Sequence, residues 1–132
     1  MPKRSTLLPS KGELRILQIL WQLNQATVED VVSAYKSWRK PNYKTTQTLL
    51  RIMEEKGFIS HFNRGRVFVF VPLVNREEIG RSTVRELLKD TFGGSPAELL
   101  VNLIEGMTIK EQELDELEHI IKTYRGKTRA AK

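Results

Sequence analysis

Residues 43–71 read YKTTQTLLRIMEEKGFISHFNRGRVFVFV and carry the clearest structural pattern in the chain. Apolar residues recur at helical spacing in the first half, which predicts a helix over residues 43–56. Gly57 is a typical helix stop, because glycine readily takes the left-handed conformation that ends many helices. Aromatic and β-branched residues then flank an Asn-Arg-Gly turn at 63–65, which indicates a β-hairpin.

Two more helices are predicted before this segment. Ser10 followed by Glu13 is a capping-box pattern that opens a helix over residues 10–24. Thr27 followed by Asp30 opens a second helix, which we expect to reach about residue 38. Three helices followed by a hairpin predict a winged helix-turn-helix, in which the third helix is the recognition helix.

Shorter amphipathic helices are predicted after the hairpin, over residues 75–92, 95–105 and 108–126. Thr108, with Glu111 three positions later, is expected to cap the last of them. Glycines are expected to end these helices, at Gly93-Gly94, Gly106 and Gly126.

Short amphipathic helices of this kind cannot enclose much core by themselves. We expect them to intertwine with a second copy and bury their apolar stripes in a homodimer. Packing back onto the N-terminal half in a monomer is the alternative. The dimer contacts are expected at Leu87, Leu88, Leu99, Leu100, Leu103, Leu114, Leu117, Ile121 and Tyr124.

The predicted fold class is therefore mainly α with a small β wing. A winged helix-turn-helix domain is expected over residues 1–75 and a C-terminal helical dimerisation domain over 76–126. Residues 127–132 are expected to form a disordered basic tail.

Charge is divided unevenly along the chain. Residues 1–75 hold 12 Lys or Arg against 5 Asp or Glu, whereas residues 76–124 hold 6 against 11. Four more basic residues lie in the last eight positions. A basic N-terminal half fits a polyanionic partner such as double-stranded DNA, although a solvated basic surface without a partner is the plainer interpretation of charge alone.

Several classes of protein are excluded by composition and motif. The chain has no cysteine, so disulfides, thiolate metal sites and cysteine nucleophiles are absent. No apolar run is long enough to insert into a membrane, and no secretory signal precedes the first helix, so a cytoplasmic protein is expected. No catalytic motif is present; we expect no enzyme activity, no cofactor and no metal, and we interpret His61 and His119 as structural.

DNA-binding residues are expected on the polar face of the third helix and at the hairpin tip. Gln47 can pair with adenine, and Thr45 and Thr48 can contact a thymine methyl or a phosphate. Lys44 and Arg51 are assigned to phosphates, and Arg64 and Arg66 to the backbone or a minor groove. The alternatives are an ordinary polar helix face and a solubilising hairpin tip.

Four aromatic residues are interpreted as core. They are Trp21, Trp38, Phe68 and Phe70. A stacking platform for single-stranded nucleic acid is the other use that such residues could have.

The chain resembles the penicillinase repressor family, which includes BlaI, MecI and the copper-responsive CopY repressors. The resemblance runs from about residue 8 to 124. The segments that carry it are GELRILQILW at 12–21, ATVEDVV at 26–32, YKTTQTLLRIMEEKGFI at 43–59, the wing at 60–71, FGGSPAELLVNLIE at 92–105 and KEQELDELEHII at 110–121.

The resemblance implies a dimeric transcriptional repressor that binds inverted repeats in promoters, often with TACA/TGTA-type half-sites. It also implies release by proteolysis, triggered by a membrane sensor protease and carried out by it or by a downstream protease. The family's scissile Asn-Phe pair aligns with Asn102-Leu103, where the aromatic residue is missing. The cysteine cluster of the copper-responsive members is absent. A protein-binding winged-helix adaptor or a general architectural DNA-binding protein is the alternative function.

Overall fold

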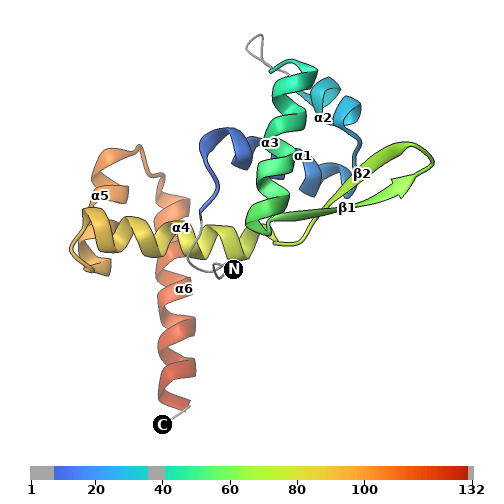
Figure 1. The fold of residues 1–132 in the computed structure, drawn as a ribbon. Coiled ribbons are helices and arrows are strands. Elements are labelled where there is room, and N and C mark those ends of the chain that lie inside the picture. Colours follow the sequence, from blue (N-terminus) through green and yellow to red (C-terminus); the bar gives the residue numbers. More distant parts are fainter. Residues whose placement is uncertain (1–7, 36–40, 131–132) are drawn as a thin grey trace. The chain divides into compact units, whose positions relative to one another are not determined.

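The computed structural model describes residues 8–35 and 41–130, and it is mainly helical with a two-stranded antiparallel sheet (Figure 1). The predicted fold class, a winged helix-turn-helix followed by helices, is confirmed. The elements in chain order are α1 (Lys11–Leu23), α2 (Val28–Ala34), α3 (Tyr43–Lys56), β1 (Ile59–Arg64), β2 (Val67–Pro72), α4 (Arg76–Thr91), α5 (Pro96–Gly106) and α6 (Glu111–Ala130).

The predicted helix starts of the first half are confirmed by their hydrogen bonds. The hydroxyl of Ser10 accepts from the backbone N–H of Glu13, whose carboxylate accepts from the N–H of Ser10 at 2.8 Å. Thr27 and Asp30 form the same reciprocal pair at 3.0 Å in both directions. Each box satisfies N–H groups that the first helical turn leaves without an internal partner.

Two helix ends differ in how well the sequence predicted them. Gly57 ends α3 in the left-handed conformation, with φ 88°, as predicted. The second helix was predicted to reach about residue 38. Instead α2 ends at Ala34, because the backbone of Tyr35 is extended, at φ −65° and ψ 128°. Val31, Val32 and Ser33, which lie in the last turn of α2, are weak helix formers, which fits the end of this helix at Ala34. The remaining predicted residues of this helix, Trp38 included, lie outside the described residues.

The hairpin pairs β1 with β2 in the register Arg64↔Val67 and His61↔Phe70, so its tip lies at Gly65 and Arg66. Gly65 has φ 64°, a conformation that side chains with a Cβ rarely adopt. Ala26 adds a short bridge to the sheet, since its N–H and carbonyl both bond to Phe70, at 3.0 and 2.8 Å. The bridge fixes the base of the hairpin to the connection between α1 and α2.

The hydrophobic core lies among α1, α2, α3 and the base of the hairpin. Phe58, Ile16, Leu17, Leu20 and Leu50 are its largest fully buried side chains, with Met53 and Ile59 beside them. Trp21 packs against this core and donates its indole N–H to the carbonyl of Val74 at 2.9 Å. Phe70 is buried, so the core prediction is confirmed for it, whereas Phe68 is 47% exposed and was wrongly predicted to be core.

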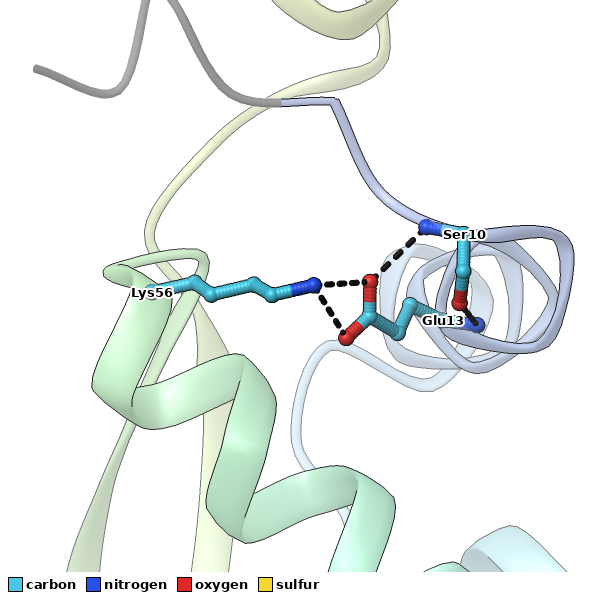
Figure 2. A network of polar contacts seen from close by, with 3 residues as sticks. All are labelled: Ser10, Glu13 and Lys56. Atoms are coloured by element: carbon cyan, nitrogen blue, oxygen red, sulfur yellow. Dashed lines mark hydrogen bonds and ion pairs between the residues drawn. The ribbon is translucent and has the colours of Figure 1, made fainter. Parts of the chain in front are cut away.

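One charged group lies within the same core. Glu13 is 2% exposed, and the ammonium of Lys56 contacts both of its carboxylate oxygens at 3.0 Å (Figure 2). Ser10 occupies the other side of this carboxylate through its backbone N–H. The contact joins the start of α1 to the end of α3.

The chain divides into two compact units, one ending at Glu86 and the other beginning at Leu87. The division falls within α4, whose first part belongs to the first unit because Ile79 is buried in its core. The sequence had predicted a domain boundary after residue 75, at the start of this helix.

The second unit has the predicted glycine turn and the predicted cap of α5. Gly93 and Gly94 have φ of 58° and 82°, and the N–H of Gly94 bonds to the carbonyl of Leu88 at 2.8 Å. The hydroxyl of Ser95 then accepts from the N–H of Glu98 at 3.2 Å, with Pro96 in the first turn. Both features are local in sequence, which is why they were predictable.

The last helix corrects three expectations. Lys110 rather than Thr108 immediately precedes its first residue, Glu111, and the N–H of Lys110 donates to the carboxylate of Glu113 at 3.0 Å. Gly126 lies inside α6, which continues through Ala130, whereas α5 does end at Gly106 as expected. The tail predicted to be disordered from residue 127 is thus helical as far as 130. A single glycine costs a helix only about 1 kcal/mol, which its neighbours can offset.

Among the described residues, no helix combines the length and the apolar character that crossing a membrane requires.

Candidate nucleic-acid interface

The start of α3 turns one row of side chains outward. The side-chain oxygen of Asn42 accepts from the N–H of Thr45 at 2.8 Å, and the backbone carbonyl of Asn42 accepts from the hydroxyl of Thr46 at 3.0 Å. Thr46 is fully buried, and the residues on either side of it are exposed. Asn42 was not singled out from the sequence, although an asparagine before a helical pattern is the expected N-cap signal.

A groove of about 950 Å³ runs between this exposed face of α3 and the hairpin, with the start of α2 at its edge. In Figure 1 the hairpin projects away from the end of α3, and both belong to the first unit. The groove brings together five predicted DNA-binding residues from two elements: Lys44, Gln47, Thr48, Arg51 and Arg66.

Two predicted DNA-binding residues lie outside this groove. Thr45 lines a smaller hollow on the adjoining side of α3, together with Asn42 and Lys44. Arg64 places its guanidinium 5.9 Å from the centre of the Phe62 ring, within the range of a cation–π contact. Residues 62 and 64 share the face of the hairpin opposite His61, because side chains alternate along a strand.

A hydrogen bond within α3 limits the DNA contacts that the side chain of Thr48 can make. Its hydroxyl donates to the carbonyl of Lys44 at 3.1 Å, one turn earlier in α3. A phosphate oxygen offers only acceptors, so it gains no proton from this hydroxyl while the helical bond is kept. The methyl group of Thr48 remains available for an apolar contact such as a thymine methyl.

A cluster that the sequence did not predict lines part of the groove. The Nδ1 atom of His61 lies 2.6 Å from Oε1 of Glu54. The His61 ring also stacks on Phe68, with the centroids 4.1 Å apart and the planes at 15°. Glu54 of α3 thus contacts the hairpin through a side chain that is 35% exposed.

The signal for this contact was present but weak. Glu54 and His61 lie at equal distances on either side of the Gly57-Phe58 turn, which folds β1 back along α3. A turn of that kind brings such positions together, but only if both residues lie on the facing sides of their elements.

Among the residues that the structure describes, no group of three or more His, Cys, Asp or Glu could hold a metal ion. The charged groups of the groove are instead arranged for contact with an extended anion. Lys44, Arg51 and Arg66 supply positive charge, and Glu29 and Glu54 are the carboxylates that line it.

An exposed recognition helix, a hairpin beside it and a groove with cations from both elements define a winged-helix protein of the DNA-binding class. Residues 9–123 match the family model described as penicillinase repressor. The match spans most of the chain, so the protein belongs to the penicillinase repressor family. This is a family of transcriptional repressors and not of enzymes.

Two relatives are distant in sequence but align over most of this chain. The penicillinase repressor of Bacillus licheniformis is 23% identical over 89% of this chain and 92% of its own length. The methicillin resistance regulatory protein MecI of Mammaliicoccus sciuri is 24% identical over 85% of this chain and 91% of its own. The monomeric form of Bacillus licheniformis BlaI, solved in complex with the blaP half-operator, aligns with a TM-score of 0.47 and 26% identity over 55% of this chain and 89% of that chain.

Proposed function

We propose that this protein represses transcription as a homodimer that binds an inverted-repeat operator, with α3 in the major groove and the hairpin against the backbone. The observation that carries the proposal is the groove in which Arg66 of the hairpin tip lies with Lys44 and Arg51 of α3. A duplex presents phosphates on both sides of its major groove, so cations on two elements can bind one duplex together.

The residues of α3 divide into readers and positioning groups. Gln47 is exposed near the start of the helix, where recognition helices contact base edges, and its amide can pair with adenine. Thr45 and Thr48 can contact thymine methyl groups. Lys44 and Arg51 contact phosphates and supply affinity that does not depend on sequence. Arg64 adds positive charge on the outer face of the hairpin.

The second unit supports a dimer because its apolar side chains lack cover. α5 has no buried residue. Leu87, Leu103 and Ile121 are 42%, 40% and 45% exposed, and Tyr124 is 63% exposed. We propose that residues 76–126 form the dimerisation domain and that residues 1–75 hold the DNA-binding domain. The remaining proposed contacts, Leu88, Leu99, Leu100, Leu114 and Leu117, are partly buried within the chain.

We further propose that repression ends by cleavage between Asn102 and Leu103, by a membrane sensor protease or by a protease downstream of it. The peptide bond between Asn102 and Leu103 lies within α5, where the side chain of Asn102 donates to the backbone carbonyl of Glu98 at 2.8 Å. A protease binds extended backbone, so α5 must open locally before cleavage. A helix of 11 residues without buried side chains opens at low cost, which supports this position.

Titration with DNA at two salt concentrations tests the proposed function. We would compare a duplex carrying an inverted TACA/TGTA repeat with a duplex of the same bases in scrambled order. An operator-binding repressor prefers the repeat and loses affinity steeply with salt. Equal binding of both duplexes would indicate an architectural protein, and binding of neither would indicate a protein-binding adaptor.

A further inference from the structure

His61, which lines the groove, is held in one orientation by its neighbours. Glu54 contacts its Nδ1 atom at 2.6 Å, and Phe68 stacks on its ring at 4.1 Å. The Phe70 ring lies 5.7 Å away at 52° and limits the ring on another side. His61 remains 27% exposed and lines the groove proposed to hold DNA.

The contact with Glu54 determines which ring nitrogen carries the proton. An ionised carboxylate can only accept a hydrogen bond, so Nδ1 must be the protonated nitrogen. In the neutral ring Nε2 then has a lone pair and no proton. No hydrogen bond to Nε2 is present within residues 8–35 and 41–130. A neutral His61 therefore presents an acceptor to the groove, and an acceptor gains nothing from a phosphate oxygen.

Charged groups of both signs line the groove with His61. Glu54 stabilises the imidazolium ion, whereas the cations of the groove oppose it. DNA phosphates entering the groove would add negative charge and favour the cation. The titratable and charged groups that line the groove with His61 are Tyr43, Lys44, Arg51 and Glu54 of α3, Arg66 of the hairpin tip and Glu29 of α2.

We infer that His61 is a further DNA-contacting residue that takes up one proton from solvent when DNA binds. The proton adds to Nε2, and the new N–H donates to a backbone phosphate oxygen. The Nδ1–H stays bonded to Glu54, so the ring keeps its orientation. The inference rests on the proposed DNA binding and adds to it a dependence on pH over the range in which histidine ordinarily changes charge.

Binding of the full chain to the inverted-repeat duplex at pH 6 and pH 8 tests this, at constant ionic strength. One proton taken up per subunit amounts to two per DNA-bound dimer, so the affinity can change by at most about a hundredfold per pH unit, and we expect Kd to be at least about tenfold higher at pH 8. Calorimetry in two buffers of different ionisation enthalpy counts the protons directly. His61→Gln should abolish both the pH dependence and the proton uptake.

The chain has a second histidine, which makes a matched control. His119 is exposed on α6, and His119→Gln should retain the behaviour of the unmodified protein. Circular dichroism establishes that each variant is folded, and His61→Asn replaces His61→Gln if glutamine disrupts the hairpin. Binding without proton uptake, or uptake that persists in a folded His61 variant, would overturn the inference. Absence of DNA binding at both pH values would instead reject the proposed function.

Glu54→Gln tests the role of the carboxylate. A glutamine amide can donate to Nδ1, which allows the neutral ring to carry its proton on Nε2 and to donate without a second proton. We expect this variant to bind nearly equally at pH 6 and pH 8. Glu55→Gln, at the exposed neighbouring position, removes the same charge and should shift Kd by the same factor at both pH values. Unchanged pH dependence in Glu54→Gln would show that Glu54 does not control His61.

Discussion

The ammonium of Lys56 contacts both carboxylate oxygens of Glu13 at 3.0 Å, across 43 positions of sequence (Figure 2). Glu13 is almost fully buried, and Lys56 is 35% exposed. The same carboxylate accepts the N–H of Ser10, so one side chain caps α1 and anchors the end of α3. Because α3 carries the proposed DNA-reading residues, this pair helps to hold the recognition helix in place.

We expect Lys56→Met to lower the free energy of unfolding by about 2 kcal/mol, because it leaves a buried carboxylate without its cation. Lys11→Met, at an exposed position of α1, should change it by less than about 0.5 kcal/mol. Urea unfolding measures both. If Lys56→Met costs the same in a Glu13→Gln background, the two side chains are not energetically coupled.

Gln47→Ala and Arg51→Ala should differ in kind. Loss of the Gln47 amide should cost about 1–3 kcal/mol on the preferred operator and relax the preference at one base pair. Loss of the Arg51 guanidinium should weaken all sequences alike and reduce the salt slope by about 1. Titrations against the repeat and the scrambled duplex separate the two. Equal losses on both duplexes for Gln47→Ala would refute its assignment as a base reader.

The two hairpin arginines form a matched pair. Arg66 lines the groove, whereas Arg64 lies over the ring of Phe62 on the other face. We expect Arg66→Ala to reduce DNA affinity and flatten its salt dependence, and Arg64→Ala to do so much less. The order of the two Kd values at low salt is the measurement. A larger effect from Arg64→Ala would mean that DNA contacts the outer face of the hairpin.

The parts of this structure that could be predicted are those that depend on near neighbours. The Ser10 and Thr27 boxes and the Gly57 stop each involve residues within a few positions, so their patterns are visible in sequence. Gly126 was misread because a local stop signal yields to the helix on both sides of it.

The aromatic residues of β2 show where sequence patterns fail. Phe68 and Phe70 lie two positions apart in β2, so they share one face of the hairpin and look equivalent in the sequence. Phe70 is buried where the Ala26 bridge joins the sheet to the helices, and Phe68 lies two residue pairs further toward the hairpin tip, beyond the core. Phe68 contacts His61, and His61 contacts Glu54, because the core ends before it reaches this part of the hairpin. No local sequence pattern encodes where the core ends.

We expect Tyr35 to make the stability of the fold depend on pH in the alkaline range. Burial raises the pKa of its phenol, and the nearby Arg15 lowers it in part. Since the folded-state pKa is raised, the contribution of Tyr35 to stability is fully present below the unfolded pKa of about 10 and is lost as pH rises through the folded value. Tyr35→Phe should therefore lose less stability above about pH 10 than the unmodified protein does. Tyr43→Phe, at a 53% exposed position, is the control, and equal slopes in both variants would contradict the prediction.

The last prediction concerns where the first unit ends and what the second contributes. Ile79 of α4 is 6% exposed in the first core, and the guanidinium of Arg76 lies 5.7 Å from the centre of the Trp21 ring. A fragment of residues 1–86 keeps both contacts, and a fragment of residues 1–75 loses them. Burial of one isoleucine contributes about 1.5–3 kcal/mol, so the longer fragment should unfold at a clearly higher urea concentration.

Both fragments lack the exposed apolar helices and should sediment as monomers with weak DNA binding, because linkage to a second half-site is lost. The full chain should sediment as a dimer at tens of micromolar, and Leu117→Asp should dissociate it while Glu118→Gln does not. A full chain that sediments as a monomer would refute the dimer, and equal stability of the two fragments would place the end of the first unit at residue 75.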